Sequence, residues 1–441
     1  MAASVFDSPL FAGLFPTGEA GRLFSDSAAL RAMLLVEGAL AKAQGALGII
    51  PEVSAAAIHR ATLEIQIDPG ALAQSTGANG VCVPGMVAAF RAELNAPEHA
   101  QYLHWGATSQ DIIDTGLMLR LRQSLALAET DLRQITQALA DQAKQYAELP
   151  MAARTYGQQA TPTSWGAVLA GWGMPLLDAL EALPDLRENS LWVSLSGATG
   201  TASALGDKAP ALRAALAEGL ALKDPGRSWH TDRGPILRIA GWMAQVTATL
   251  AAMGQSLIAL ATTELREVTF RDAGASSTMP QKQNPVAASV LVALSHQMGG
   301  LQAALQAASV HQHQRDGAAW FTEWMVMPQI MLSGASALQQ TKQIMETLQP
   351  NVGQMAAGLD QGLGLIHAEA LSFALAAKMP RPDAQAETKA LCRAATQAGT
   401  SLEHLARTRH PDLPADLFHP SAQLGQAPSD ARAFAARARA L

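Results

Sequence analysis

The sequence has few cysteines and little charge. Cys82 and Cys392 are the only cysteines among 441 residues, which excludes a disulfide framework and fits a reducing, cytoplasmic compartment. Lys and Arg number 31 against 37 Asp and Glu, a net charge of −6, so we expect no nucleic-acid partner, which would require a basic face. Charged residues make up 15 %, below the roughly 25 % of ordinary soluble domains. Some surface of the protomer is therefore expected to be buried between subunits.

The sequence also predicts no targeting or membrane-spanning segment. No basic segment followed by an apolar run opens the sequence, so we expect no signal peptide. Two stretches, 239–263 and 285–314, lack formal charge over about the length of a membrane span. Polar residues such as Gln245 and Gln255 interrupt the first stretch. A helix buried on every side within a bundle is the better interpretation, and we expect no membrane contact.

The residues that are abundant predict an all-α protein. Apolar residues reach 49 %, which excludes intrinsic disorder. Alanine is the commonest residue and aromatic residues make up only 5 %. Alanine has the highest helix propensity, so this composition favours long, closely packed helices. We find no alternation of useful length that would predict strands.

Helical spacing of apolar residues continues through most of the chain. Ser25 and Asp26 can cap a first helix that ends near Gly48. The longer helices are predicted over 109–147, 163–186, 234–266, 285–308 and 320–348. Helices after Pro350 are short. We therefore predict an N-terminal helical domain over 1–108, a central long-helix bundle over 109–350 and a small C-terminal helical domain over 351–441.

A segment between two long helices, residues 271–285, has the composition of a ligand-binding loop. Gly274 frees the backbone, and Pro280 interrupts helix formation. Lys282 and Asn284 stand where the next helix begins. A cation, an amide and a helix N-terminus together favour an anion. An ordinary interhelix loop is the alternative.

The same segment carries the pattern Ser-Ser-x-Met-Pro-x-Lys-x-Asn, which resembles the signature of the fumarase/aspartase superfamily. The matching residues are Ser276, Ser277, Met279, Pro280, Lys282 and Asn284. The resemblance implies that Ser276 transfers the proton. It also implies that Lys282 and Asn284 bind and polarise a substrate carboxylate.

A second segment, His104 to Asp111, is similar to a motif of the adenylosuccinate lyase and cycloisomerase branches of that superfamily. Thr108 and Ser109 are expected to offer hydroxyl and backbone donors to a carboxylate where a helix begins. Capping that helix is the structural alternative, and the two roles are compatible. His104 lies beside a tryptophan, so it is either a packed side chain or a substrate contact.

A third segment resembles the Arg-Thr-His-x-Gln-x-Ala-x-Pro block of the superfamily, over residues 154–162. Thr155 and Gln158 match this block and are expected to line the pocket. Tyr156 stands where many members have a general-acid histidine. This departure bears directly on the reaction.

Two more positions follow from the cycloisomerase branch. His230 lies in a Trp-His-Thr block and is expected to contact substrate. Arg315 is a candidate fork for a carboxylate, with a solvated charge at a helix end as the alternative. His311 and His313 form a close pair that no carboxylate or cysteine cluster accompanies, so we expect no metal site.

The resemblance covers residues from about 20 to 375 and implies a homotetramer whose active sites collect segments from three subunits. The implied reaction is cycloisomerisation of the tricarboxylate 3-carboxy-cis,cis-muconate, without a cofactor. Gln281 and Gln283 replace a histidine and an arginine common in the signature, so the substrate can differ. The alternatives are a fumarate-releasing lyase and a non-catalytic scaffold, although a scaffold would not need the combination of Ser276, Lys282 and Asn284.

Overall fold

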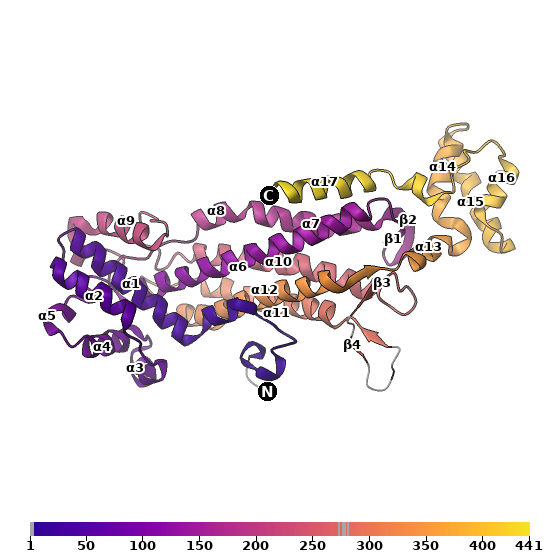
Figure 1. Ribbon diagram of the computed structural model, residues 1–441. Helices are drawn as coiled ribbons and strands as arrows, with labels where there is room; N and C mark the ends of the chain where they lie inside the picture. The colour runs from indigo at the N-terminus through magenta and orange to yellow at the C-terminus, as the bar shows by residue number, and fades with distance from the viewer. Residues whose placement is uncertain (1–3, 272–273, 276–278, 280–281) are drawn as a thin grey trace. The chain divides into compact units, whose positions relative to one another are not determined.

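The computed structural model describes residues 4–271, 274–275, 279 and 282–441, and this part of the chain is mostly helical (Figure 1). The helical class predicted from composition is thereby confirmed. The chain divides into two compact units. The first consists of Met1–Asp131, Ala179–Ala248 and Ala293–Gln339, and the second of Leu132–Asp178, Thr249–Val292 and Gln340–Leu441. The boundaries predicted after residues 108 and 350 stay a prediction.

The long helices lie close to the ranges that the apolar spacing predicts. They are α6 (Ser109–Gln145), α7 (Trp165–Glu181), α10 (Gly234–Leu260), α11 (Val286–Ala308) and α12 (Gly317–Thr347). The predicted helix over 163–186 is divided, because α7 ends before a separate short helix that begins at Leu183. Pro184 stands in the first turn of that short helix, where the missing N–H of proline is tolerated.

Shorter helices complete the first unit. They are α1 (Asp26–Ala46), α2 (Glu52–Glu64), α3 (Ala73–Asn79), α4 (Val83–Leu94), α5 (Pro97–Ala100), α8 (Leu183–Glu188) and α9 (Ala209–Leu220). The predicted cap of α1 is confirmed, since the Ser25 hydroxyl accepts a hydrogen bond from the Ala28 N–H at 3.3 Å. Helix α1 packs against α2 and α9.

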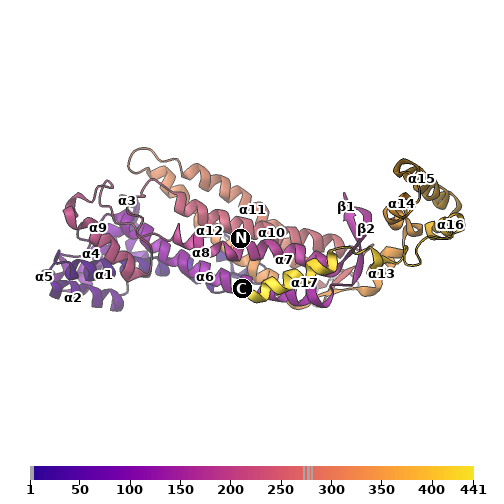
Figure 2. The same cartoon turned by 90° about the horizontal axis from the view of Figure 1, so that it is seen from above.

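Short helices also close the second unit. They are α13 (Val352–Asp360), α14 (Ala368–Ala376), α15 (Arg381–Ala398), α16 (Leu402–Arg409) and α17 (Ala427–Ala440). Figure 2 shows α14, α15 and α16 gathered together. Leu371, Leu391 and Leu402, one from each of these helices, are buried in a common apolar cluster. Short 3₁₀ helices occupy Val5–Asp7, Pro9–Phe11, Gly18–Phe24, Pro69–Leu72, Ser203–Lys208, Gly362–His367 and Pro420–Gln423.

The second unit contains short strands that the spacing of apolar residues did not predict. Strands β1 (Pro150–Thr155) and β2 (Gln158–Ser164) form an antiparallel hairpin in which Thr155 faces Gln158. The two connecting residues, Tyr156 and Gly157, both have positive φ, at 53° and 74°. Two positive φ values are typical of the tight hairpin turn that matches the twist of the strands. The alternation was too short to predict strands beside much longer helical patterns.

Two smaller antiparallel pairs accompany this hairpin. Strand β3 (Val268–Phe270) pairs with β6 (Leu348–Pro350). Strand β4 (Gly274–Ala275) pairs with β5 (Gln283–Asn284). The second pair brackets the signature segment, so it brings the two ends of that segment together.

Two helical stretches, Trp165–Glu188 and Gly234–Leu260, are long and apolar enough to span a membrane by length and composition alone. Half of the most apolar window in each is buried inside the protein. The core helices of soluble proteins meet the same criteria, so these stretches are weak evidence for a membrane protein.

Candidate active site

The segment from His104 to Asp111 leads into the N-terminus of α6 in the first unit. Helix α6 begins at Ser109, and the Asp111 carboxylate accepts a hydrogen bond from the Thr108 backbone N–H at 3.0 Å. This contact satisfies a donor that the first helical turn would otherwise leave unpaired. The side chains of Thr108 and Ser109 are half-buried, and their hydroxyls bond no described residue. Both hydroxyls are therefore available to a ligand.

Asp111 is the acceptor that organises this end of the unit. Its fully buried carboxylate accepts hydrogen bonds from donors that are far apart in the sequence. The donors are Thr108 N, Ser194 Oγ, Ser196 N, Gly197 N and His230 Nε2, at distances between 2.8 and 3.0 Å. With both oxygens engaged in this way, Asp111 is a positioning group that fixes the glycine-rich turn 196–201 beside α6.

His230 is held by Asp111 rather than exposed to solvent. Its side chain is buried, and its Nε2 lies 2.8 Å from Asp111 Oδ1. Donation from Nε2 leaves Nδ1 as an acceptor, and Nδ1 has no hydrogen-bond partner among the described residues. The predicted contact between His230 and a substrate thus requires a ligand that reaches Nδ1.

A buried ion-pair cluster ties the first unit together just before α10. The Arg233 guanidinium donates to both oxygens of Asp114 at 2.8 and 3.1 Å and to both oxygens of Glu323 at 2.8 and 2.6 Å. Burial disfavours the charged guanidinium, but the two carboxylates outweigh it and raise the pKa of Arg233. Burial dominates at Glu323 and raises the pKa of that carboxyl in spite of Arg233. This cluster fixes α6 and α12 against the start of α10.

Arg315, the predicted carboxylate fork, lies beside the glycine-rich turn 196–201. Its Nε donates to Gln110 Oε1 at 2.8 Å and its Nη2 donates to the Ala198 carbonyl at 3.2 Å. Gln110 is itself buried and donates to the His230 carbonyl at 2.8 Å. Arg315 is exposed and forms no ion pair with a described carboxylate. Its orientation is fixed while the remaining N–H groups stay available for an anion.

His104 has a buried carboxylate partner that the sequence did not reveal. Its Nδ1 lies 2.6 Å from Oε1 of Glu37, which is buried on α1. Burial disfavours protonation of His104, but the hydrogen bond and the charge of Glu37 outweigh it and raise the pKa above the usual 6.5. The ring is therefore packed and hydrogen-bonded, and still keeps one nitrogen for a ligand.

The third motif lies on the β1–β2 hairpin in the second unit. Thr155, Tyr156 and Gln158 are all exposed there, and Tyr156 is completely so. Arg154 anchors the hairpin through a bidentate pair with buried Glu267 at 2.7 and 2.8 Å. The hairpin thus has a fixed base and presents the three predicted site residues to solvent.

The signature segment is described only in part. Ser276, the predicted proton-transfer residue, lies outside the described residues. Lys282 is exposed, and its ammonium group bonds no described residue. Asn284 is half-buried and pairs with Gly274 in the short strands.

The predicted residues fall into two groups. His104, Thr108, Ser109, His230 and Arg315 belong to the first unit, where Asp111 and Gln110 link the last two to the start of α6. Thr155, Tyr156, Gln158, Lys282 and Asn284 belong to the second unit. Sequence reasoning assigned no role to Glu37, Asp114, Arg233 and Glu323. A charged residue inside an otherwise apolar helical pattern was the available signal. Charged residues are rarely buried unless they are paired, so such a residue indicates a buried ion pair.

Comparisons with known proteins agree with these motifs. A family whose description is "Lyase" matches residues 17–300, well over half of the chain. The protein belongs to this lyase family, the fumarase/aspartase superfamily.

Among the described residues, no group of three His, Cys, Asp or Glu side chains is placed to hold a metal ion.

Individual relatives in this family have different activities. The 3-carboxy-cis,cis-muconate cycloisomerase of Pseudomonas aeruginosa is 38 % identical over 88 % of this chain and 86 % of its own. The crystal structure of 3-carboxy-cis,cis-muconate lactonizing enzyme from Pseudomonas putida superposes with a TM-score of 0.92 at 33 % identity, covering 98 % of this chain and 99 % of that one. Nitrosuccinate lyase of Streptomyces davaonensis is 32 % identical over 97 % of this chain and 94 % of its own. Family membership therefore leaves the substrate open.

Proposed function

We propose that the protein is a cycloisomerase that interconverts 3-carboxy-cis,cis-muconate and a carboxymuconolactone in protocatechuate catabolism, without a cofactor. The observation that carries this proposal is Tyr156, which occupies the tip of a hairpin where many lyases of the superfamily have a general-acid histidine. The similarity to cycloisomerases over most of the chain supports it.

The chemistry explains why such an enzyme needs no histidine at this position. A lyase that expels an amine or hydroxide benefits from a general acid, because these leaving groups are strongly basic. A lactone opens by expelling a carboxylate, whose conjugate acid has a pKa near 4, so it leaves without a proton at neutral pH. In the reverse direction the nucleophile is a carboxylate that is already ionised. A phenol is a much weaker acid than an imidazolium, so Tyr156 is poorly suited to replace that histidine as the general acid at neutral pH.

Ser276 carries the proton in the proposed reaction. In lactone opening it removes the proton α to a carboxylate, and in ring closure it returns that proton. The resulting aci-carboxylate carries two negative charges, so donors must be directed at it. Lys282 and Asn284 supply a cation and an amide, and Thr108 and Ser109 supply hydroxyls.

Arg315 is proposed to hold a second carboxylate of the tricarboxylate substrate. Its guanidinium is oriented by Gln110 and Ala198 and has no carboxylate of its own. A planar fork with free N–H groups matches a carboxylate in two hydrogen bonds. An oriented but unpaired arginine is better suited to this role than to that of a solvated surface charge.

We further propose that the sites are completed in a homotetramer. Thr155, Tyr156 and Gln158 are exposed in the protomer, whereas sites for small molecules bury most of their ligand. Walls supplied by other subunits would enclose these side chains. Light scattering at micromolar concentration should show a stable tetramer, and a fully active monomer would contradict this proposal.

The decisive experiment is turnover of 3-carboxy-cis,cis-muconate, followed by loss of the ultraviolet absorbance of the diene. A different lyase of the superfamily, such as one that releases fumarate, is the second candidate, because nitrosuccinate lyase is 32 % identical over 97 % of this chain. Nitrosuccinate, adenylosuccinate and argininosuccinate should therefore be assayed in parallel for fumarate. We expect consumption of the diene and no fumarate. Release of fumarate with no consumption of the diene would replace the proposal with the second candidate.

A further inference from the structure

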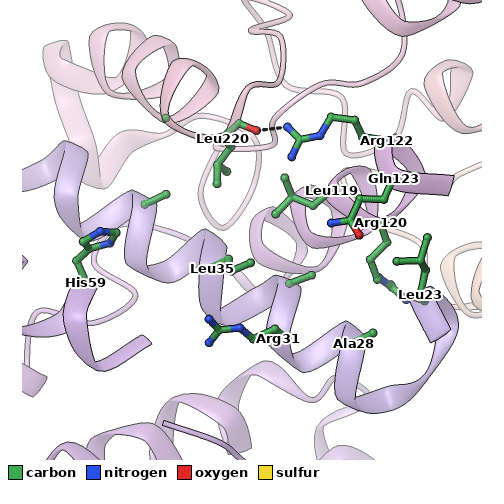
Figure 3. Close-up of a pocket in the computed structure, with 13 residues that line it drawn as sticks. Leu23, Ala28, Arg31, Leu35, His59, Leu119, Arg120, Arg122, Gln123 and Leu220 are labelled. Carbon is green, nitrogen blue, oxygen red and sulfur yellow. Dashed lines mark hydrogen bonds between the residues drawn. The ribbon is translucent and has the colours of Figure 1, made fainter. Parts of the chain in front are cut away.

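A cationic cavity lies in the first unit, between α1, α2, α6 and the end of α9 (Figure 3). Its volume is about 330 Å³, within the range of small-ligand sites. Arg31, Arg120, Arg122 and His59 line it, and no acidic residue does. None of the residues assigned to the proposed active site lines it either.

Two of these arginines have structural roles that engage only part of each guanidinium. Arg31 Nη1 donates to the Thr62 carbonyl at 2.6 Å, near the end of α2. Arg122 Nη1 donates to the Ala221 carbonyl at 2.9 Å and also to that of Leu220, at the end of α9. These contacts cap the carbonyl ends of two helices, where cations are favourable. A guanidinium has five N–H donors, so each arginine keeps several for another acceptor.

Among the described residues no carboxylate forms an ion pair with this group of arginines, although the charge of Asp26 favours the charged form of Arg120. Arg31, Arg120 and Arg122 form no ion pair with any described residue. The Arg120 Nε–H is buried and has no hydrogen-bond partner among the described residues. Burial lowers the pKa of Arg120 to about 10, so it still carries a charge at neutral pH. Arg120 is half-buried, so a bound anion would stabilise its charge next to the cavity.

The apolar lining indicates what kind of anion fits. Figure 3 shows Arg31 and Arg122 on opposite sides of the space, with Leu35 and Leu119 between them. Inorganic phosphate would leave these aliphatic walls uncovered. A hydrocarbon skeleton that carries a carboxylate at each end would cover the walls and pair with both guanidinium groups.

We propose that this cavity is a second binding site, specific for a short organic acid with two or more carboxylates. Arg31 and Arg122 each bind one carboxylate through the N–H groups that the helix caps leave free, and the leucines contact the skeleton. The inference is independent of the proposed reaction, because it uses no residue of the proposed active site.

Calorimetric titration of the full-length protein with citrate tests this site. We expect Arg31→Gln and Arg122→Gln each to weaken citrate binding by at least about tenfold, the effect of losing a charge-assisted hydrogen bond of about 1.5 kcal/mol. The matched control is Arg60→Gln, the same change at an exposed arginine of α2 that does not line the cavity. It should bind citrate like the parent protein.

Further variants separate this site from the proposed active site. Citrate binding at the cavity should persist in Lys282→Ala, whereas binding lost in Lys282→Ala and kept in Arg31→Gln would overturn the proposal. Inorganic phosphate should bind at least about tenfold more weakly than citrate, because it gains no apolar contact. Equal or tighter phosphate binding, or no citrate binding to the parent protein, would also overturn it. Arg31 is exposed on α1, so Arg31→Gln keeps the test valid if Arg122→Gln fails to fold.

Discussion

The start of α6 and the signature segment carry two parts of the proposed site, and they are built in opposite ways. At the start of α6, the buried Asp111 carboxylate is saturated with donors and Arg233 is paired with two buried carboxylates. In the signature segment, Lys282 is exposed and its ammonium group bonds no described residue, and Asn284 lies in a strand of two residues.

Because of this difference, substitutions in the two regions should affect different properties, stability in one and turnover in the other. Contacts within one protomer already fix the groups around α6, so substitutions there should lower the free energy of unfolding. The described part of the signature segment has few such contacts. In the proposed homotetramer, bound substrate and another subunit would supply further contacts, so substitutions there should affect turnover with little effect on stability.

The largest expected effect on stability is that of Arg233→Met. This change leaves the Asp114 and Glu323 carboxylates buried without their cation. Breaking a buried ion pair costs about 3–5 kcal/mol, because the remaining charge has no compensation. Denaturant unfolding should show this loss. Arg227→Gln, which breaks the exposed pair with Asp232, is the control and should cost only about 0–1 kcal/mol.

The largest expected effect on turnover alone is that of Ser276→Ala. We expect kcat to fall at least about 10²-fold, the usual size of lost acid–base assistance, while substrate still binds. Thr278→Ala removes a hydroxyl at a variable position of the same motif and should remain close to the parent in turnover. Turnover like that of the parent in Ser276→Ala would show that another residue moves the proton.

The sequence predicted the helices and the motif residues better than the contacts between distant residues. Helices such as α1, with its Ser25 cap, follow from periodicity and local hydrogen bonds. The motifs identified the family and the signature residues. The partners of Asp111 and Arg233 remained hidden, because His230 is 119 residues from Asp111 and Glu323 is 90 residues from Arg233. Only the folded chain brings such residues together.

The hairpin was missed for a different reason. Its turn depends on positive φ at Tyr156 and Gly157, and only Gly157 is a residue that favours this conformation. Tertiary anchoring of Arg154 by Glu267 compensates for the weak local signal. Glycine after a tyrosine was therefore the one available indication of the turn.

A smaller effect tests whether Glu37 controls the charge of His104. The folded-state pKa of His104 is raised above 6.5, so this pair stabilises the fold fully below pH 6.5 and less as pH rises through the folded pKa. Glu37→Gln should remove this pH dependence, a change on the order of 1 kcal/mol for one hydrogen bond.

The other charged groups near His104 stay the same in this variant. Asp111 favours the protonated ring and Arg91 opposes it, and both remain in Glu37→Gln. Titration of His104 by NMR should show its pKa falling in the variant. A pKa that stays above 6.5 would show that Asp111, and not Glu37, controls the charge of the ring.

The smallest expected effect is that of Tyr156→Phe, and it distinguishes the two candidate reactions. Tyr156 is completely exposed at the hairpin tip, so removing its hydroxyl breaks no contact within the described part of the chain. Expulsion of a carboxylate needs no general acid, so cycloisomerase turnover should stay within about tenfold of the parent, the loss of one hydrogen bond to substrate. A lyase that used this phenol as its acid would lose at least about 10²-fold. Loss of that size in diene consumption would assign the proton transfer to Tyr156 and contradict the leaving-group argument on which the cycloisomerase proposal depends.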